Sequence, residues 1–130
     1  MVVKHVKILW LNDRKIKLLE DEISYFIDLG WLYLGNNKLI SIPQEITKLT
    51  NLVRLDLSNN QLKKLPLGIN KLTKLKRLTL KFNKLTSLPI EMENLKNLEW
   101  LEVDNINIDD IPLIVPTILY KLTKLTINQL

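Results

Sequence analysis

Residues 52–74 read LVRLDLSNNQLKKLPLGINKLTK, and the same pattern returns along the chain every 23 residues. With x for a variable position, the pattern is LxxLxLxxNxLxxLPxxIxxLxx. It fits residues 6–28, 29–51, 52–74, 75–97 and 98–120, and positions 1, 4, 6, 11, 14, 18 and 21 are apolar in all five blocks. A repeat of this length is one supersecondary unit that buries its apolar face only by stacking on its neighbours. The sequence therefore predicts a solenoid.

We predict a single domain that covers all 130 residues. One extra residue after Pro116 extends the fifth block, and in the new frame Leu122, Leu125 and Ile127 predict a sixth strand. The predicted repeats are 6–28, 29–51, 52–74, 75–97 and 98–121, with a partial repeat at 122–130.

These motifs resemble the leucine-rich repeat family, in the class with Leu-Pro or Ile-Pro in mid-repeat that is typical of intracellular Ras-related leucine-rich repeat proteins. The resemblance covers residues 6–130. It implies an α/β fold, a right-handed curved solenoid with a parallel sheet on its concave side and mostly non-helical or 3-10 segments on its convex side. It also implies a noncatalytic scaffold or adaptor that holds a protein partner on the concave sheet.

In this family positions 3 to 5 of each repeat form a short strand, so side chains at positions 3 and 5 face solvent while those at 4 and 6 enter the core. Position 9 is asparagine in the three middle blocks, at Asn37, Asn60 and Asn83. Their amides can bond backbone groups that the turn leaves unpaired, so we predict a structural asparagine ladder. The segment LLEDEISYFIDL at 18–29 predicts a true helical turn in the first block.

The solvent-facing strand positions give the predicted binding surface. Aromatic side chains there offer a large contact area with little rotamer entropy to lose, as in interface hot spots. The alternative is that Trp10 and Tyr33 simply stack on each other across neighbouring strands. Phe82, at position 8, is predicted either to extend this face at its rim or to pack over the asparagine ladder. The candidate partner-binding residues are Trp10, Trp31, Tyr33, Arg54, Asp56, Arg77, Trp100 and Glu102.

Charge is sorted along the array. Residues 52–97 carry ten Lys and Arg against three Asp and Glu, whereas 98–120 carry five acidic residues and no basic one. The lysines near position 10 form a predicted basic ridge, whose simpler interpretation is a solvated face. Arg54 and Arg77 on neighbouring strands repel each other unless Asp56 or a bound anion offsets them. The ridge consists of Lys15, Lys38, Lys63, Lys64 and Lys84.

The residues assemble no enzyme site. His5 is the single histidine, cysteine is absent, and the three glycines form no phosphate-binding loop. Glu99, Glu102 and Asp104 lie along a regular strand rather than in the close loop that a cation site needs. We therefore predict no catalysis, no cofactor and no metal.

Composition also predicts the compartment. Without cysteine, a signal-peptide pattern at the N-terminus or 18 consecutive apolar residues, we expect an intracellular, cytoplasmic protein without a membrane span. The alanine-free composition, rich in Lys, Asn and Ile, suggests an AT-rich genome such as that of a large DNA virus, a protist or an intracellular bacterium, which for a virus or such a bacterium would place the protein in the host cytoplasm.

Two other functions stay open at this stage. A pI near 9.4 and interleaved Trp and Arg fit an anion or nucleic-acid binder, although nucleic acid is the less favoured partner. The apolar C-terminal end before Leu130 fits a homo-oligomer that pairs through its terminal strand.

Overall fold

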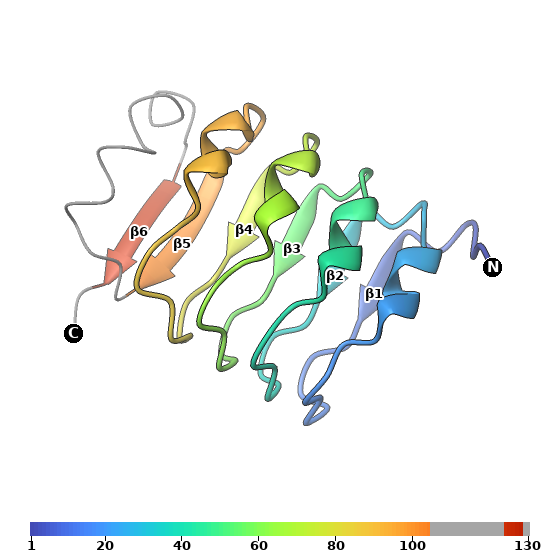
Figure 1. Ribbon diagram of the computed structural model, residues 1–130, viewed down its shortest axis with the longest axis horizontal. Helices are drawn as coiled ribbons and strands as arrows, with labels where there is room; N and C mark the ends of the chain where they lie inside the picture. Colours follow the sequence, from blue (N-terminus) through green and yellow to red (C-terminus); the bar gives the residue numbers. More distant parts are fainter. Residues whose placement is uncertain (105–123, 129–130) are drawn as a thin grey trace.

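The computed structural model describes residues 1–104 and the strand Lys124–Asn128. Six short strands lie side by side in chain order, and four 3-10 helices run along the opposite side of the array (Figure 1). The strands are β1 (Ile8–Trp10), β2 (Trp31–Tyr33), β3 (Arg54–Asp56), β4 (Arg77–Thr79), β5 (Trp100–Asp104) and β6 (Lys124–Asn128). The helices are η1 (Asp21–Tyr25), η2 (Gln44–Lys48), η3 (Leu67–Lys71) and η4 (Ile90–Asn94). This confirms the predicted solenoid with a parallel concave sheet.

Strand register follows the 23-residue repeat. Leu9, Leu32, Leu55 and Leu78 pair in sequence across β1 to β4, each 23 residues from the next. Between β5 and β6 the pairing is Trp100 with Lys124, a separation of 124 − 100 = 24 residues. The extra residue therefore shifts the frame between these two strands.

The core consists of the repeated apolar positions. In the blocks that begin at Leu29, Leu52 and Leu75, all seven of these side chains are buried. The first block differs, because only Leu19 and Ile23 are fully buried there. Val6, Leu9, Leu11, Ile16 and Phe26 are partly buried, since no described repeat covers the outer side of β1.

The predicted helical turn of the first block is a 3-10 helix that does not differ from those of the other repeats. Asp21–Tyr25 forms a 3-10 helix like its three counterparts, and it packs against η2 in the same position of the repeat. Proline precedes η2, η3 and η4, whereas Glu20 precedes η1 with a similarly extended backbone. The missing proline therefore leaves this segment unchanged.

Several predictions fall on residues 105–123 and 129–130, outside the described residues. They include the second half of the fifth repeat with Pro112, the acidic residues Asp109 and Asp110, and Leu122. Self-association through the end of the chain at Leu130 stays a prediction from the sequence for the same reason.

Candidate binding surface

Strands β1 to β5 turn their first and third side chains toward solvent, so the concave face carries two parallel rows. Register aligns the rows from strand to strand. All of these side chains are half-buried or exposed, whereas the leucine between them on each of β2 to β5 is buried. The first row is Ile8, Trp31, Arg54, Arg77 and Trp100, and the second is Trp10, Tyr33, Asp56, Thr79 and Glu102.

Three aromatic residues form a continuous cluster at the N-terminal end of this face, which we call the aromatic shelf (Trp10, Trp31 and Tyr33). The rings of Trp10 and Tyr33 stack at 4.2 Å between centroids with an angle of 6°. Trp31 meets Tyr33 edge to face at 6.5 Å and 87°. The predicted stacking is thus present, yet Trp10 remains 58% exposed. Stacking and exposure coexist because, among the described strands, β1 is the edge of the sheet and none covers the second face of the indole.

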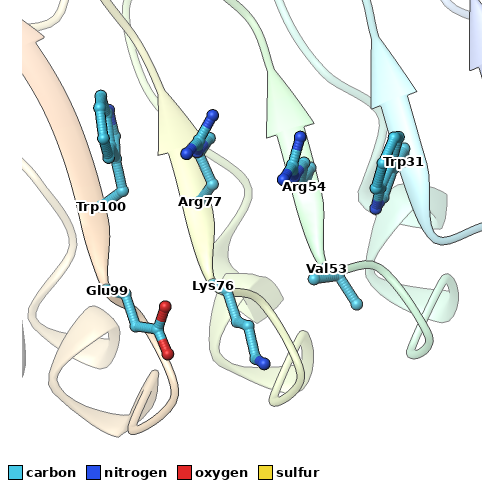
Figure 2. Close-up of a pocket in the computed structure, with 7 residues that line it drawn as sticks. All are labelled: Trp31, Val53, Arg54, Lys76, Arg77, Glu99 and Trp100. Atoms are coloured by element: carbon cyan, nitrogen blue, oxygen red, sulfur yellow. The ribbon is translucent and has the colours of Figure 1, made fainter.

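Arg54 and Arg77 occupy paired positions on β3 and β4. Each guanidinium lies over the tryptophan on the neighbouring strand away from the other arginine. Arg54 lies over Trp31 of β2 and Arg77 over Trp100 of β5, each 4.3 Å from the ring centroid (Figure 2). Such contacts stabilise by roughly 0.5–1 kcal/mol at exposed sites. Within residues 1–104, no ion pair joins either arginine to a carboxylate. We define these two residues as the arginine pair.

Two adjoining hollows contact the arginine pair. The larger, of about 240 Å³, spans the first row between the two tryptophans and reaches Val53, Lys76 and Glu99 (Figure 2). The smaller, of about 150 Å³, extends toward the second row and is lined by Tyr33, Leu55, Asp56 and Thr79 in addition to both arginines. The arginine pair therefore borders one hollow that lies between the two tryptophans and another that leads to the aromatic shelf.

Asp56 does not neutralise the arginine pair. Its Oδ1 accepts hydrogen bonds from the Ser58 amide at 2.9 Å, the Ser58 hydroxyl at 2.7 Å and the Thr79 hydroxyl at 2.7 Å. These neutral donors fix the position of the carboxylate, and none of them is a cation that pairs with it. The sequence-based suggestion that Asp56 offsets Arg54 and Arg77 is therefore replaced by the two arginine–tryptophan contacts.

Glu102 belongs to a separate cluster on β5. Its Oε1 accepts a hydrogen bond from the Trp100 indole at 2.8 Å, and its Oε2 lies 3.5 Å from Nζ of Lys81. These contacts orient the Trp100 ring against which Arg77 packs. Glu102 thus positions a neighbour in the surface.

The asparagines at position 9 are buried and form the ladder that their position predicts. Asn60 donates to the carbonyls of Leu34 at 2.9 Å and Leu57 at 3.1 Å and accepts from the Leu39 amide at 3.0 Å. Asn37 and Asn83 repeat this arrangement one block earlier and later. Each amide therefore joins two consecutive repeats.

Phe82 has a feature that the sequence analysis missed. Its φ is 60°, in the left-handed region, and its side chain is 61% exposed rather than packed on the ladder. The same position of earlier repeats holds Asp13, Asn36 and Asn59, which also have positive φ. Asn and Asp tolerate this conformation, whereas a bulky residue there is an outlier. The series Asp13, Asn36 and Asn59 in the sequence could have predicted the left-handed backbone at Phe82.

Other predicted features lie apart from this surface. His5 is exposed, with its amide 3.2 Å from a carboxylate oxygen of Asp28. The lysines of the basic ridge are exposed at the turns that follow the strands. In the described part of the chain, no three His, Cys, Asp or Glu side chains are grouped to hold a metal ion, and no helix there is long and apolar enough to cross a membrane.

The fold and this surface define a repeat solenoid with a sheet face suited to binding. The family description "leucine-rich repeat region" matches residues 3–129, so the chain belongs to the leucine-rich repeat family. A comparison with curated proteins gives no match. The family is typically a noncatalytic scaffold, and its fold commonly mediates protein–protein interaction.

Solved structures agree with this assignment. A leucine-rich repeat protein of Leptospira interrogans is 42% identical, with a TM-score of 0.79, over 85% of this chain and 28% of that protein. The BIR2 ectodomain of Arabidopsis thaliana is 32% identical, with a TM-score of 0.66, over 76% of this chain and 54% of that chain. Internalin C2 of Listeria monocytogenes, at 24% identity, shares the fold with a TM-score of 0.77 over 95% of this chain and 52% of that one. This chain therefore spans about a quarter to a half of the length of these proteins.

Proposed function

We propose that this chain is a noncatalytic protein-binding module whose partner docks on the concave sheet. The observation that carries the proposal is the aromatic shelf, where Trp10 stays 58% exposed although it stacks flat on Tyr33. The stack and the edge contact from Trp31 hold these rings in place, so binding would cost little side-chain entropy. Large rigid aromatics on a preformed surface are the usual anchors of a protein interface.

The test compares capture of partners from the native cell by the wild-type protein and by Trp10→Ala. The Trp10→Ala substitution leaves the core unchanged, because Trp10 is not part of it. Circular dichroism of the variant should therefore match that of the wild type. Truncating such an anchor costs about 2 kcal/mol or more in binding, which is more than an order of magnitude in Kd for the purified partner. Trp31→Ala and Tyr33→Ala are expected to weaken the same partner.

Leu67→Ala is the matched control, because Leu67 is a large apolar side chain, 75% exposed, on η3 at the opposite side of the solenoid. It should leave capture unchanged. Equal capture by wild type and all three shelf variants would reject the concave docking site.

Anion or nucleic-acid binding is the second candidate, and the arginine pair supports it. Binding to a polyanion would fall steeply with salt because counterions are released, whereas binding to an aromatic-centred protein interface would change little. A titration with a duplex and with a single-stranded oligonucleotide at two salt concentrations separates these functions. Cytoplasmic location likewise remains a proposal from composition, to be checked by imaging a tagged chain.

A further inference from the structure

We infer that the arginine pair receives one carboxylate, from a single Asp or Glu side chain within an extended segment of the protein partner. The inference rests on the proposed function, because it names the chemistry of the partner on the same concave sheet. It adds a polar specificity element to the apolar anchoring of the aromatic shelf.

The two arginines carry like charges without a nearby carboxylate. Arg54 and Arg77 are direct neighbours in a parallel sheet, where strands lie about 4.8 Å apart and like charges destabilise each other. Neither guanidinium has a carboxylate partner among residues 1–104. A carboxylate bound over the solvent-facing edges of both guanidiniums would offset this repulsion and could accept from both.

Contact with the tryptophans restricts both guanidiniums. The Cζ atom of each arginine lies over an indole ring, 4.3 Å from the centroid (Figure 2). An arginine that packs the face of its planar guanidinium on an aromatic ring keeps its N–H donors free along the edges of that plane. Packing of this kind would leave the donors of both arginines available for bidentate recognition of a carboxylate.

The charge of Asp56 favours a single carboxylate over a polyanion. Asp56 borders the smaller hollow and is held by neutral donors only, so its negative charge remains on this face. A nucleic-acid strand carries a phosphate about every 3.4 Å along its helix axis, so it would bring further charges over Asp56. A single carboxylate within a protein segment avoids that repulsion.

A continuous path leads from the arginine pair to the aromatic shelf. The smaller hollow connects the arginine pair with Tyr33 over the Leu55 position. Two strand spacings of about 4.8 Å and two residues of about 3.3 Å along the strand separate the arginine pair from the centre of the Trp10–Tyr33 stack, roughly 12 Å in all. An extended chain covers that distance in three to four residues. The partner segment should therefore carry a large apolar residue three or four positions from its acidic residue.

The experiment selects binders from a display library of random twelve-residue segments inserted into a loop of a carrier protein, so that no free C-terminus is presented. Selected segments are then measured as acetylated and amidated peptides. We expect an enriched Asp or Glu with a large apolar residue three or four positions away. Replacing that acidic residue by its amide should weaken binding by more than about tenfold, the usual result of truncating a desolvated charge pair.

Arg54→Gln combined with Arg77→Gln should cause the same loss, and the peptide change should then have little additional effect, since both substitutions remove one interaction. Lys38→Gln combined with Lys84→Gln is the control, because it changes the net charge equally on the exposed basic ridge. This control should keep the affinity within about twofold, as for exposed rim charges. Unchanged circular dichroism and thermal unfolding ensure that the arginine variant is folded.

A selection without acidic binders overturns the inference, and apolar binders that are lost in Trp10→Ala would leave the proposed function standing. Acidic binders that are insensitive to the arginine substitutions also overturn it. A peptide that binds only with a free C-terminal carboxylate would assign the pair to a chain end instead of a side chain. Stronger, steeply salt-dependent binding of an oligonucleotide that requires the arginine pair would overturn it in favour of phosphate.

Discussion

The backbone amide of Phe82 donates a hydrogen bond to Oδ2 of Asp104, 2.8 Å away on the next repeat. This contact fixes a residue whose φ of 60° is unfavourable for a bulky side chain. Asp104 is 3% exposed, so the bond lies in a protected position. Phe82 nevertheless projects its ring into solvent, beside a hollow that also contains Asn59 and Lys81. The exposed ring therefore gains little burial that would offset the unfavourable backbone conformation.

The first prediction is that Phe82→Asn stabilises the protein. Left-handed backbone costs a non-glycine residue roughly 1–2 kcal/mol, and asparagine reduces this cost by bonding locally. We expect the free energy of unfolding in urea to rise by about 1 kcal/mol. Asn59 occupies the same position of the preceding repeat, which shows that asparagine fits there. Its side-chain amide donates a hydrogen bond to Oδ1 of Asn36 at 2.5 Å.

Phe82→Leu serves as the control, because it replaces the ring by a smaller apolar side chain that is also poorly suited to positive φ. Its stability should stay close to that of the wild type. A less stable Phe82→Asn variant would mean that the ring contributes packing that its 61% exposure does not suggest.

The second prediction concerns the ladder. Asn60→Leu should destabilise the fold by about 1–3 kcal/mol, because the buried amide of Leu39 loses its acceptor and the carbonyls of Leu34 and Leu57 each lose one of two amide donors. Gln61→Leu, at the exposed neighbouring position, makes the same polar-to-leucine change without touching the ladder. Urea denaturation that gives both variants the same midpoint would contradict the structural role of Asn60.

The third prediction concerns Asp56. Asp56→Ala should cost about 1–3 kcal/mol, since two hydroxyls and one amide lose their shared acceptor. Asp56→Asn keeps an oxygen at the same place and should cost less. Thermal unfolding of the two variants tests this order, and the reverse order would show that the charge matters more than the acceptor.

The repeat made the fold predictable because every block repeats one solution to the same packing problem. Leu55 and its equivalents must enter the core wherever their strand lies, so the alternation alone assigned the two concave rows. The ladder followed as well, since Asn60 occupies the turn where unpaired backbone groups meet. These features depend on position within the repeat rather than on the particular neighbours.

The pairing of concave side chains was less predictable, because it depends on rotamers that neighbouring strands decide together. Arg54 packs on Trp31 and Arg77 on Trp100, in opposite directions, although both arginines occupy the same position of the repeat. In the first row, each arginine packs on the neighbouring tryptophan and not toward the other arginine. The order of residues in this row is compatible with that arrangement but does not predict it. The strain at Phe82 likewise required the backbone dihedral angle.

The last prediction compares one position at the end and in the middle of the array. Leu9 and Leu55 occupy the same place in β1 and β3, but Leu9 is partly buried whereas Leu55 is 1% exposed. Replacing a fully buried leucine by alanine costs about 2–5 kcal/mol through lost transfer energy and a residual cavity. Leu55→Ala should therefore lose that amount, while Leu9→Ala should lose clearly less because its site is already hydrated on one side. Native-state hydrogen exchange should agree, with the amides of β1 exchanging before those of β3, as expected for local opening at the end of a repeat array. Equal losses in the free energy of unfolding would mean that the first repeat is covered in solution by chain or partner contacts beyond those described.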